Sequence, residues 1–400
     1  ISEDPISSEV SLPSEVPPAS SEDIPSSENP VYLTNIGQIK ALGETYRAQV
    51  NEQGYYVSDV LAKFDAQVLT VHDYVATTAL TQYKALVANE TGYIVVHISK
   101  ATYTRLDTYK HLHQVNEFIG YVAVFNDEIA IHTLGVSEPR YLADALVSYD
   151  YRDYAIEGDS IAGLLSRVKA RKMNLKGVNS SEDIYKYTLV YITKLEAKIG
   201  LFSDGVNIIQ VHGYKTLNNG LTPHGVYDVY GREGMYLFKP QFELISWETN
   251  NSVTLTVNLA AMSSSLSATT LYDYKYVRDS ATAFNANMRY ADMLVNVYYF
   301  AGYANYYTKG SNDFIVFEDT LKTKAYTTYT NALGAKAMFV NNEDGEDLYS
   351  QYEWDHSPYT PYVPGEVKHG TKVGFYFIGY EYNPNKYWKV QILSKLVELD

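Results

Sequence analysis

Three stretches of the chain each contain two runs of aromatic and β-branched residues joined by a short turn, and this pattern most constrains the fold. The first joins residues 117–125 to 128–134 through Asn126-Asp127, and the second joins 225–238 to 241–247 through Lys239-Pro240. The third joins 370–380 to 386–393 through Asn383-Pro384-Asn385. Runs of this composition on either side of turn residues predict antiparallel β-hairpins. Each hairpin is expected to end a domain.

The segments upstream of the three hairpins follow one plan. A strand-like run comes first, at residues 68–75, 187–193 and 294–300. A pair of strands follows, at 83–98, 197–211 and 303–317, with turn residues near 89–92, 203–205 and 309–313. Apolar residues at helical spacing precede each first strand, at 34–50, 161–173 and 272–293, which predicts packing helices.

The segment between the middle pair and the final hairpin differs among the three units. Residues 104–112 have a helical pattern, residues 214–224 resemble a loop, and the third unit has a long insertion. Together these patterns predict a stalk at residues 1–30 and domains at 31–140, 141–250 and 251–400. The insertion covers about 319–369 of the third domain.

Five strands in this order, with a helix or loop before the last two, resemble the oligonucleotide/oligosaccharide-binding (OB) fold. The chain is similar to tandem OB-fold domains of exported bacterial proteins and lipoproteins that carry a Ser/Pro/Glu-rich stalk. The second unit matches this plan best, through residues 225–247. The resemblance implies a mainly β chain with some α structure, built from tandem OB-like five-stranded barrels with short connecting helices. A seven-stranded sandwich is the rival fold for the third unit.

Composition indicates a β-rich and acidic chain. Tyrosine supplies 40 of the 400 residues, and this residue favours half-buried pleated surfaces. The net charge is −15, of which seven acids lie in the first thirty residues, so the remaining chain carries −8. This balance excludes a strongly basic nucleic-acid footprint, and the absence of cysteine excludes disulfides and thiolate sites.

Residues 1–30 hold nine serines and six prolines together with those acids, a composition typical of an extended, solvated segment. We interpret this stretch as a spacer, and an ordinary disordered terminus is the alternative. The expected location is extracellular or on the cell surface of a bacterium, with room for a lipid anchor upstream of residue 1. No apolar run in the sequence is long enough to span a bilayer.

No short catalytic signature is present in the sequence, and we expect a protein that is not an enzyme. Asp355-His356-Ser357 has the residue types of an acyl-transfer triad, but sequence neighbours point apart. A hydrolase site within 319–369 is therefore the least favoured alternative. His111 and His113 have the wrong spacing for chelation from a helix, and the acidic turn at 341–347 lacks the spacing of a calcium loop. No metal site and no cofactor are expected.

Aromatic side chains are the richer signal, because ring faces stack on bases and sugars. Tyr299 belongs to this group, and His97 and His212 occupy corresponding places after the middle strands of two units. The alternative is that such residues have a packing role, filling the barrels and covering the faces of the sheets. The candidate binding residues are Tyr93, His97, Tyr191, His212, Tyr230, Tyr236, Tyr298 and Trp354.

These observations lead to a noncatalytic recognition protein that binds an extended ligand on aromatic barrel faces. An oligosaccharide is favoured over a nucleic acid because the folded part is acidic. A structural or adhesin-type module that binds a surface protein is the alternative.

Overall fold

The computed structural model describes most of the chain between residue 30 and the C-terminus. The described residues are 30–51, 55–77, 80–108, 114–125, 128–137, 140–141, 149–170, 178–180, 183–196, 198–213, 220–236, 239–265, 296–309, 312–318, 320–321, 337–340, 369–383, 387–394 and 397–400. The stalk prediction for residues 1–30 falls almost wholly outside them, as does the helix predicted at 272–293.

The chain divides into two compact units. The first comprises Ile1–Ile156, Ala170–Ile184 and Gly234–Leu237. The second comprises Glu157–Lys169, Tyr185–Glu233 and Phe238–Asp400.

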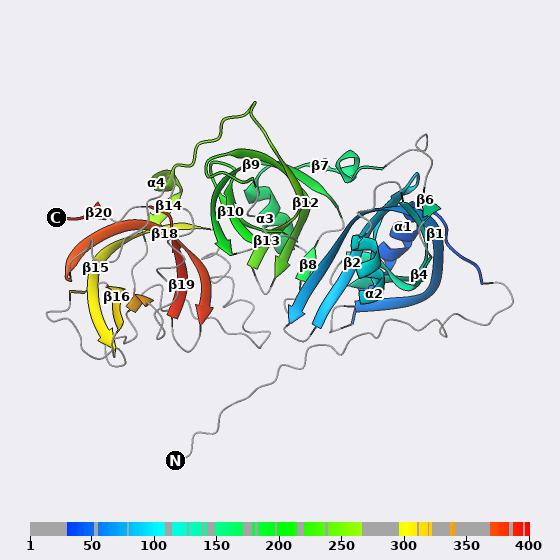
Figure 1. Cartoon of the computed structure of the whole chain (residues 1–400), viewed down its shortest axis with the longest axis horizontal. Helices are drawn as coiled ribbons and strands as arrows, with labels where there is room; N and C mark the ends of the chain where they lie inside the picture. Colours follow the sequence, from blue (N-terminus) through cyan, green and yellow to red (C-terminus); the bar gives the residue numbers. More distant parts are fainter. Residues whose placement is uncertain are drawn as a thin grey trace, which may run out of the picture. The chain divides into compact units, whose positions relative to one another are not determined.

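The first unit contains a closed five-stranded barrel, which we call barrel 1 (Figure 1). Its strands pair in the order β1-β2-β3-β5-β4, and β4 returns to β1 to close the ring. The β3–β5 pair is parallel, and the other pairs of the ring are antiparallel. The strands are β1 (Tyr55–Thr77), β2 (Leu80–Asn89), β3 (Gly92–Ile98), β4 (Gln114–Phe125) and β5 (Glu128–Val136), and the short β6 (Arg140–Tyr141) extends β4.

Two helices pack on barrel 1, α1 (Ile36–Tyr46) and α2 (Lys100–Thr108). Apolar residues of α1, among them Ile36 and Ile39, join the barrel core. Gly43 lets this helix approach β5, since a Cβ there would lie 2.3 Å from the Ile129 side chain. The 3₁₀ helices η2 (Arg47–Gln49) and η3 (Tyr151–Tyr154) are short connections.

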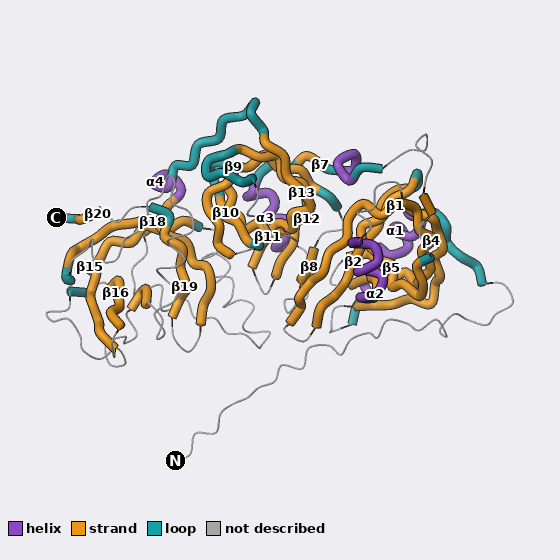
Figure 2. Tube along the Cα trace, in the orientation of Figure 1, coloured by secondary structure: helices purple, strands orange, loops and turns teal. Residues whose placement is uncertain are grey.

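The second unit contains a barrel of the same topology, barrel 2, ordered β9-β10-β11-β13-β12 with β12 closing onto β9. The β11–β13 pair is again parallel. Figure 2 draws α3 (Ile161–Ala170) among these strands, with Ile161, Leu164 and Val168 buried. The strands are β9 (Tyr185–Glu196), β10 (Ile199–Ser203), β11 (Ile208–Gly213), β12 (Val226–Tyr236) and β13 (Lys239–Thr249), and the short β7 (Ile156–Glu157) extends the sheet beside β9. The short β8 (Val178–Ser180) pairs with the last residues of β12, and this pair is counted with the first unit.

The third sheet, barrel 3, uses the same strand order opened at one place, β17-β16-β15-β18-β19. Among the described residues, no β17–β19 ladder closes it. Its strands are β15 (Val297–Lys309), β16 (Asn312–Glu318), β17 (Ala337–Val340), β18 (Thr371–Asn383) and β19 (Tyr387–Ile392), and β14 (Ser263–Ser265), β20 (Val397–Glu398) and α4 (Leu259–Met262) complete the described elements.

The predicted fold class is confirmed, because the chain is mainly β and contains two closed five-stranded barrels in the OB strand order. The turn predicted at Lys239-Pro240 is wrong, since these residues begin β13 and the connection lies two residues earlier. Proline is tolerated at the start of a strand, where the missing donor costs little. Asn126-Asp127 and Pro384-Asn385 lie outside the described residues, between strands that pair as predicted.

Two further predictions need correction. The first strand of barrel 1 starts at Tyr55 rather than near residue 68, because its N-terminal half pairs with β4 and its C-terminal half with β2. Likewise, residues 297–309 form the single strand β15 rather than two strands. The domain boundaries at 140 and 250 stay predictions.

Candidate functional site

The face of the second and third strands is where OB folds commonly bind ligands. In barrel 1, Ile94, Val96 and Ile98 of β3 belong to the core, so Val95 and His97 point to the outer face. Val95 is nevertheless only 1% exposed, and Leu86 of β2 is also 1% exposed. The outer face of β2 and β3 is therefore covered within the chain.

Tyr93 on the same strand shows part of this cover. Its ring lies 5.0 Å from that of Tyr154 in η3, and its hydroxyl donates to Asp183 at 3.1 Å. Lys40 of α1 places its ammonium 4.3 Å from the ring centroid. This candidate residue is thus engaged from three sides by the first unit itself.

A buried charged cluster occupies the outer face of barrel 1, where β2, β3 and β5 meet. Lys84 and Glu128 form an ion pair at 2.8 Å, and the two side chains are 4% and 1% exposed. His97 Nε2 lies 3.3 Å from the same Glu128 oxygen, and the Phe125 ring stacks on the imidazole at 4.2 Å. Burial lowers the pKa of His97 to about 4, against a smaller opposing effect of the bond to Glu128. The imidazole is therefore neutral at pH 7.

The corresponding face of barrel 2 is covered as well. Leu201 of β10 and Ile208 of β11 join an apolar cluster that includes Val297 and Ile378 of barrel 3. Beside this cluster the parallel pair places His212 opposite Glu243, which is fully buried in an ion pair with Arg232 at 3.1 Å. His212 thus occupies the position in barrel 2 that His97 occupies in barrel 1. The partner of His97 on the parallel strand is His132. The predicted correspondence of the two histidines is a property of the shared strand order.

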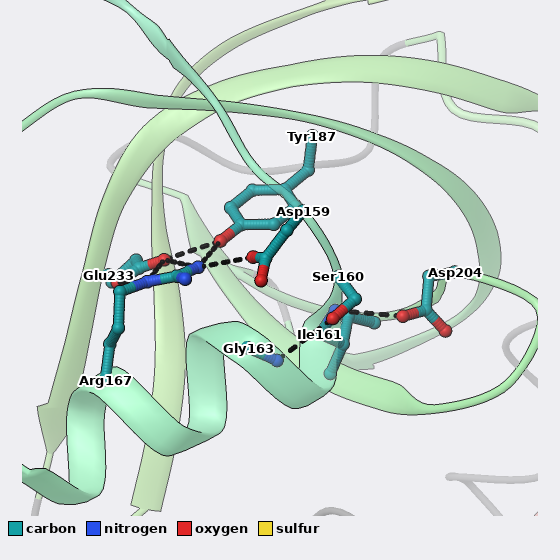
Figure 3. Close-up of polar contacts among 8 residues, drawn as sticks. All are labelled: Asp159, Ser160, Ile161, Gly163, Arg167, Tyr187, Asp204 and Glu233. Carbon is teal, nitrogen blue, oxygen red and sulfur yellow. Dashed lines mark hydrogen bonds and ion pairs between the residues drawn. The ribbon is translucent and has the colours of Figure 1, made fainter.

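A second polar network joins α3 to the strands of barrel 2, and in it Glu233 is buried whereas Arg167 and Asp159 are 35% and 61% exposed (Figure 3). Arg167 of α3 donates two bonds from Nε at 3.1 Å and one from Nη2 at 2.8 Å to the fully buried carboxylate of Glu233. The same guanidinium donates to Asp159 and to the hydroxyl of Tyr187, which itself donates to Glu233. Every group in this network has a partner that fixes it to the helix or the sheet.

Contacts within this network shift the pKa values of its members. Hydrogen bonds to Glu233 and Asp159 raise the pKa of Arg167, and the bond from Arg167 lowers the pKa of Asp159. Burial, followed by the bond to Glu233, raises the pKa of Tyr187. A tyrosine that holds its proton this firmly and is 3% exposed is unsuited to acid–base work on a ligand.

The outer face of the first and fourth strands of barrel 3 is only partly covered. At one end Val297 and Ile378 are buried in the cluster shared with barrel 2, and Tyr376 packs against that cluster. Along β15 and β18, core residues alternate with Tyr299, Tyr303 and Tyr376, which are half-buried, and with Ala301, which is exposed. Tyr299 is the register partner of Tyr376, and their ring centroids lie 5.0 Å apart. We call the three residues Tyr299, Tyr303 and Tyr376 the tyrosine face.

A glycine shapes this face. A Cβ at Gly374 would lie 2.1 Å from the Tyr299 hydroxyl oxygen and 3.3 Å from a methyl carbon of Leu399. The Tyr299 side chain therefore reaches across the backbone of β18, where any larger residue would collide with it. This arrangement shields the glycine and holds an aromatic side chain on the outer surface of the sheet.

The charges beside the tyrosine face are few. Lys372, the register partner of Tyr303, donates to the backbone carbonyl of Asp400 at 3.1 Å. Glu398 and Asp400 are exposed at the adjoining C-terminal strand. The described surroundings thus carry more negative than positive charge.

The structure separates the predicted binding residues into groups. Tyr191, Tyr230 and Tyr298 are 5%, 7% and 6% exposed, so these three are packing residues. Tyr191 contacts Phe202, Tyr298 contacts Phe377, and Tyr230 donates to Glu248. The side chain of Tyr236 and all of Trp354 lie outside the described residues. None of the predicted residues whose side chains the structure describes joins another in a common open site.

Sequence reasoning missed Tyr303 and Tyr376, and it ranked Tyr298 above Tyr299. Successive residues of a strand point to opposite faces, so a choice between neighbours requires the strand register. The alternation of Tyr299, Ala301 and Tyr303 in the sequence indicated that these residues share one face. The buried positions of Tyr298 and Phe300 show that this face is the outer one.

Among the described residues, no cluster of His, Asp and Glu could hold a metal ion. No helix in the described part of the chain is long and apolar enough to cross a membrane. The predicted hydrolase alternative at 319–369 lies almost wholly outside the described residues.

Comparison with known proteins gives fold-level likeness only. No family model matches the chain, and no curated protein matches its sequence. Among solved structures, the p204 HINb domain is similar, with 17% identity, a TM-score of 0.27, and coverage of 46% of this chain and 95% of that one. The Ifi202 HINa domain in complex with 20-base-pair double-stranded DNA has 12% identity and a TM-score of 0.26, and 49% and 98% are covered. A murine DNA-binding protein bound to double-stranded DNA has 12% identity and a TM-score of 0.26, with 47% and 97% covered. At these TM-scores the likeness does not bear on ligand or activity.

Proposed function

We propose that this chain is a noncatalytic recognition protein that binds an extended oligosaccharide across the tyrosine face of barrel 3. The observation that carries the proposal is the Tyr299–Tyr376 pair held over Gly374 on an outer sheet surface. The β2–β3 face of barrel 1 and the β10–β11 face of barrel 2 are covered by the chain itself. On barrel 3, Tyr299 and Tyr303 remain half-buried on the outer face, and Tyr376, which also packs against the apolar cluster shared with barrel 2, contacts the Tyr299 ring.

The physical basis is stacking. A pyranose ring has an apolar face of C–H groups, and an aromatic ring binds such a face through dispersion and weak C–H contacts. Tyr299 and Tyr303 are four residues apart on one strand, which places their side chains on the same face about 13 Å apart. A ligand that contacts both must be extended, because a single sugar ring does not reach that far.

The charge around the tyrosine face distinguishes between an oligosaccharide and a nucleic acid as ligand. A nucleic acid gains affinity by releasing counterions when lysines and arginines meet its phosphates. The ammonium of Lys372 is already bonded to the Asp400 carbonyl, and two exposed acids adjoin the face. This arrangement favours an uncharged oligosaccharide over an oligonucleotide. Export to a bacterial cell surface, with residues 1–30 as a spacer, is part of the same proposal and is motivated by their Ser/Pro/Glu composition.

The test is a binding panel of neutral oligosaccharides and single-stranded oligonucleotides on the full chain. Replacing Tyr299 by Leu keeps an apolar cover over Gly374 and removes the ring. It should weaken oligosaccharide binding by about fivefold to a hundredfold, the equivalent of one lost stacking contact. Tyr32→Ala is the matched control, because Tyr32 is also half-buried and contacts a lysine in the first unit.

Affinity should change little between low and moderate salt. A steep loss with salt, together with binding to oligonucleotides, would assign the face to nucleic acid instead. Unchanged affinity in both Tyr299→Leu and Tyr376→Leu would remove the tyrosine face from the function.

A structural or adhesin-type module is the second candidate, and the apolar cluster favours it. Ile192, Leu195, Leu201 and Ile208 of barrel 2 share one buried cluster with barrel 3, as expected of a rigid spacer or scaffold. Absence of binding across the whole panel, with a folded chain, would favour this reading.

A further inference from the structure

Barrel 1 contains a buried group that the proposed function does not use. His97 shares one oxygen of Glu128 with Lys84, and its register partner on the parallel strand is His132. All four side chains are at least 85% buried, and Phe125 covers the imidazole of His97 with its ring. A lysine and a histidine therefore share one carboxylate on the covered outer face of the barrel, and a second histidine lies opposite the first on the neighbouring strand.

The charge balance of this site holds only while the histidines are neutral. Lys84 and Glu128 cancel each other, so proton uptake by His97 would leave an extra positive charge away from water, beside an ammonium. The other charged groups of described elements beside this face are Lys40 of α1, whose ammonium lies over the Tyr93 ring, and Asp183, which accepts from Tyr93. Asp150, Arg152 and Asp153 lie in and beside η3, whose Tyr154 ring contacts that of Tyr93. A buried charge without its own counterion is costly, and the chain avoids the cost by opening the site to water.

We infer that the Lys84–Glu128–His97 cluster is an acid-sensitive lock, which keeps the outer face of β2, β3 and β5 covered at neutral pH and releases it in acid. What the lock releases is the face that carries Val95, Leu86 and Ala130, each at most 1% exposed. The OB fold commonly uses this face for ligands, so release would uncover a second, apolar surface on barrel 1.

The direction of the response follows from the site. Burial holds the pKa of His97 at about 4, below its ordinary value of 6.5. The covered form binds fewer protons than the open form between these values, so it loses stability as the pH falls from 6.5 to 4. The open population should rise on the order of 100-fold between pH 7 and pH 4 from this histidine alone.

Hydrogen exchange on the full chain, corrected for the intrinsic effect of pH, measures this opening at β3 and β5. Protection of these strands should fall by about 100-fold from pH 7 to pH 4 in the wild type. His97→Gln should abolish most of this pH dependence, since glutamine has no proton to gain. His212→Gln in barrel 2 is the matched control and should leave the response of β3 and β5 intact.

The Lys84→Met variant provides an independent test of the inference. Without the competing ammonium, Glu128 pairs with His97 alone. The pH at which β3 and β5 lose their protection should therefore change. A merely structural histidine predicts instead a constant loss of protection at every pH in His97→Gln. That result, or a wild-type chain whose β3 and β5 show no change between pH 7 and pH 4, would overturn the inference.

Discussion

Barrels 1 and 2 have the same strand order, yet they hold their lead-in helices by different chemistry. Gly120 and Gly231 mark equivalent places, because each lies against the backbone of the fifth strand, at His132 and Glu243 respectively. Counting from these glycines and from the helix starts matches Leu42, Phe64 and Val122 of barrel 1 with Arg167, Tyr187 and Glu233 of barrel 2. The first set belongs to an apolar core and its margin. The second set is the hydrogen-bonded network of Figure 3.

The same backbone therefore accepts either apolar or hydrogen-bonded side chains at these three positions. A buried ion pair gains little over well-packed apolar side chains, but removing one partner of it is expensive. The polar version therefore makes barrel 2 more sensitive to single substitutions than barrel 1. It also fixes the helix by directional bonds rather than by packing alone.

Arg167→Leu should produce the largest effect. It leaves the carboxylate of Glu233, which is fully buried, without its main counterion. The free energy of unfolding of barrel 2 should fall by about 3 kcal/mol, the lower end of the loss for a fully buried pair, because Arg167 itself is 35% exposed. Urea unfolding followed by hydrogen exchange of β9 and β12 measures the loss.

The triple variant Arg167→Leu, Tyr187→Phe, Glu233→Val tests the comparison directly. It gives barrel 2 the residues of barrel 1, and its stability should return to within about 1–2 kcal/mol of the wild type. A triple variant as unstable as the single one would show that the two barrels are not equivalent at these positions.

A second contrast lies on the outer faces, where His97 is opposite His132 in barrel 1 and His212 is opposite Glu243 in barrel 2. Because burial lowers the pKa of His97 to about 4, its contribution to stability is complete above pH 6.5 and is lost as the pH falls toward 4. The loss should reach about 3 kcal/mol at pH 4. Urea unfolding of the first unit at pH 7 and pH 4 checks it, with His97→Gln showing a smaller difference between the two pH values.

The helix starts provide a third, smaller contrast. In both barrels the first amide of the lead-in helix donates to a side chain of the middle-strand turn, to Thr91 for Ile36 and to Asp204 for Ile161. Asp204→Ala should cost about 1–2 kcal/mol, because it removes a charge at a helix N-terminus and two further bonds within the turn. Thr91→Val should cost about 1 kcal/mol or less. Equal losses, measured by thermal unfolding, would mean that the charge contributes nothing.

The smallest effect is expected at the exposed pair Lys63–Glu117 on barrel 1, whose atoms lie 3.4 Å apart. Both side chains are more than one third exposed, so the double-mutant coupling energy should stay below about 0.5 kcal/mol. A coupling above 1 kcal/mol would show that this surface is less solvated than the structure indicates.

Local patterns in the sequence are sufficient to predict the kind of fold. Alternating runs such as 117–125 and 128–134 encode strands locally, and turn residues such as Asn89 to Gly92 encode the reversal between them. The helical spacing of Ile161, Leu164 and Val168 likewise marks the face of α3 that becomes buried. These signals depend on neighbours in the chain, so they can be read without knowing what lies across the barrel.

Which aromatic residues are open and which charged groups are buried depends on contacts between strands that are distant in the sequence. Tyr298 and Tyr299 are indistinguishable in composition, and the register of β15 against β18 sends one to the core and the other to the surface. The turn at Lys239-Pro240 was misplaced for a similar reason, since pairing across the sheet fixed where β13 begins. The pairs Lys84–Glu128 and Arg167–Glu233 join residues 44 and 66 positions apart, a separation that leaves no local trace in the sequence. Barrel closure brings these charges together, and burial then makes each of them depend on its partner.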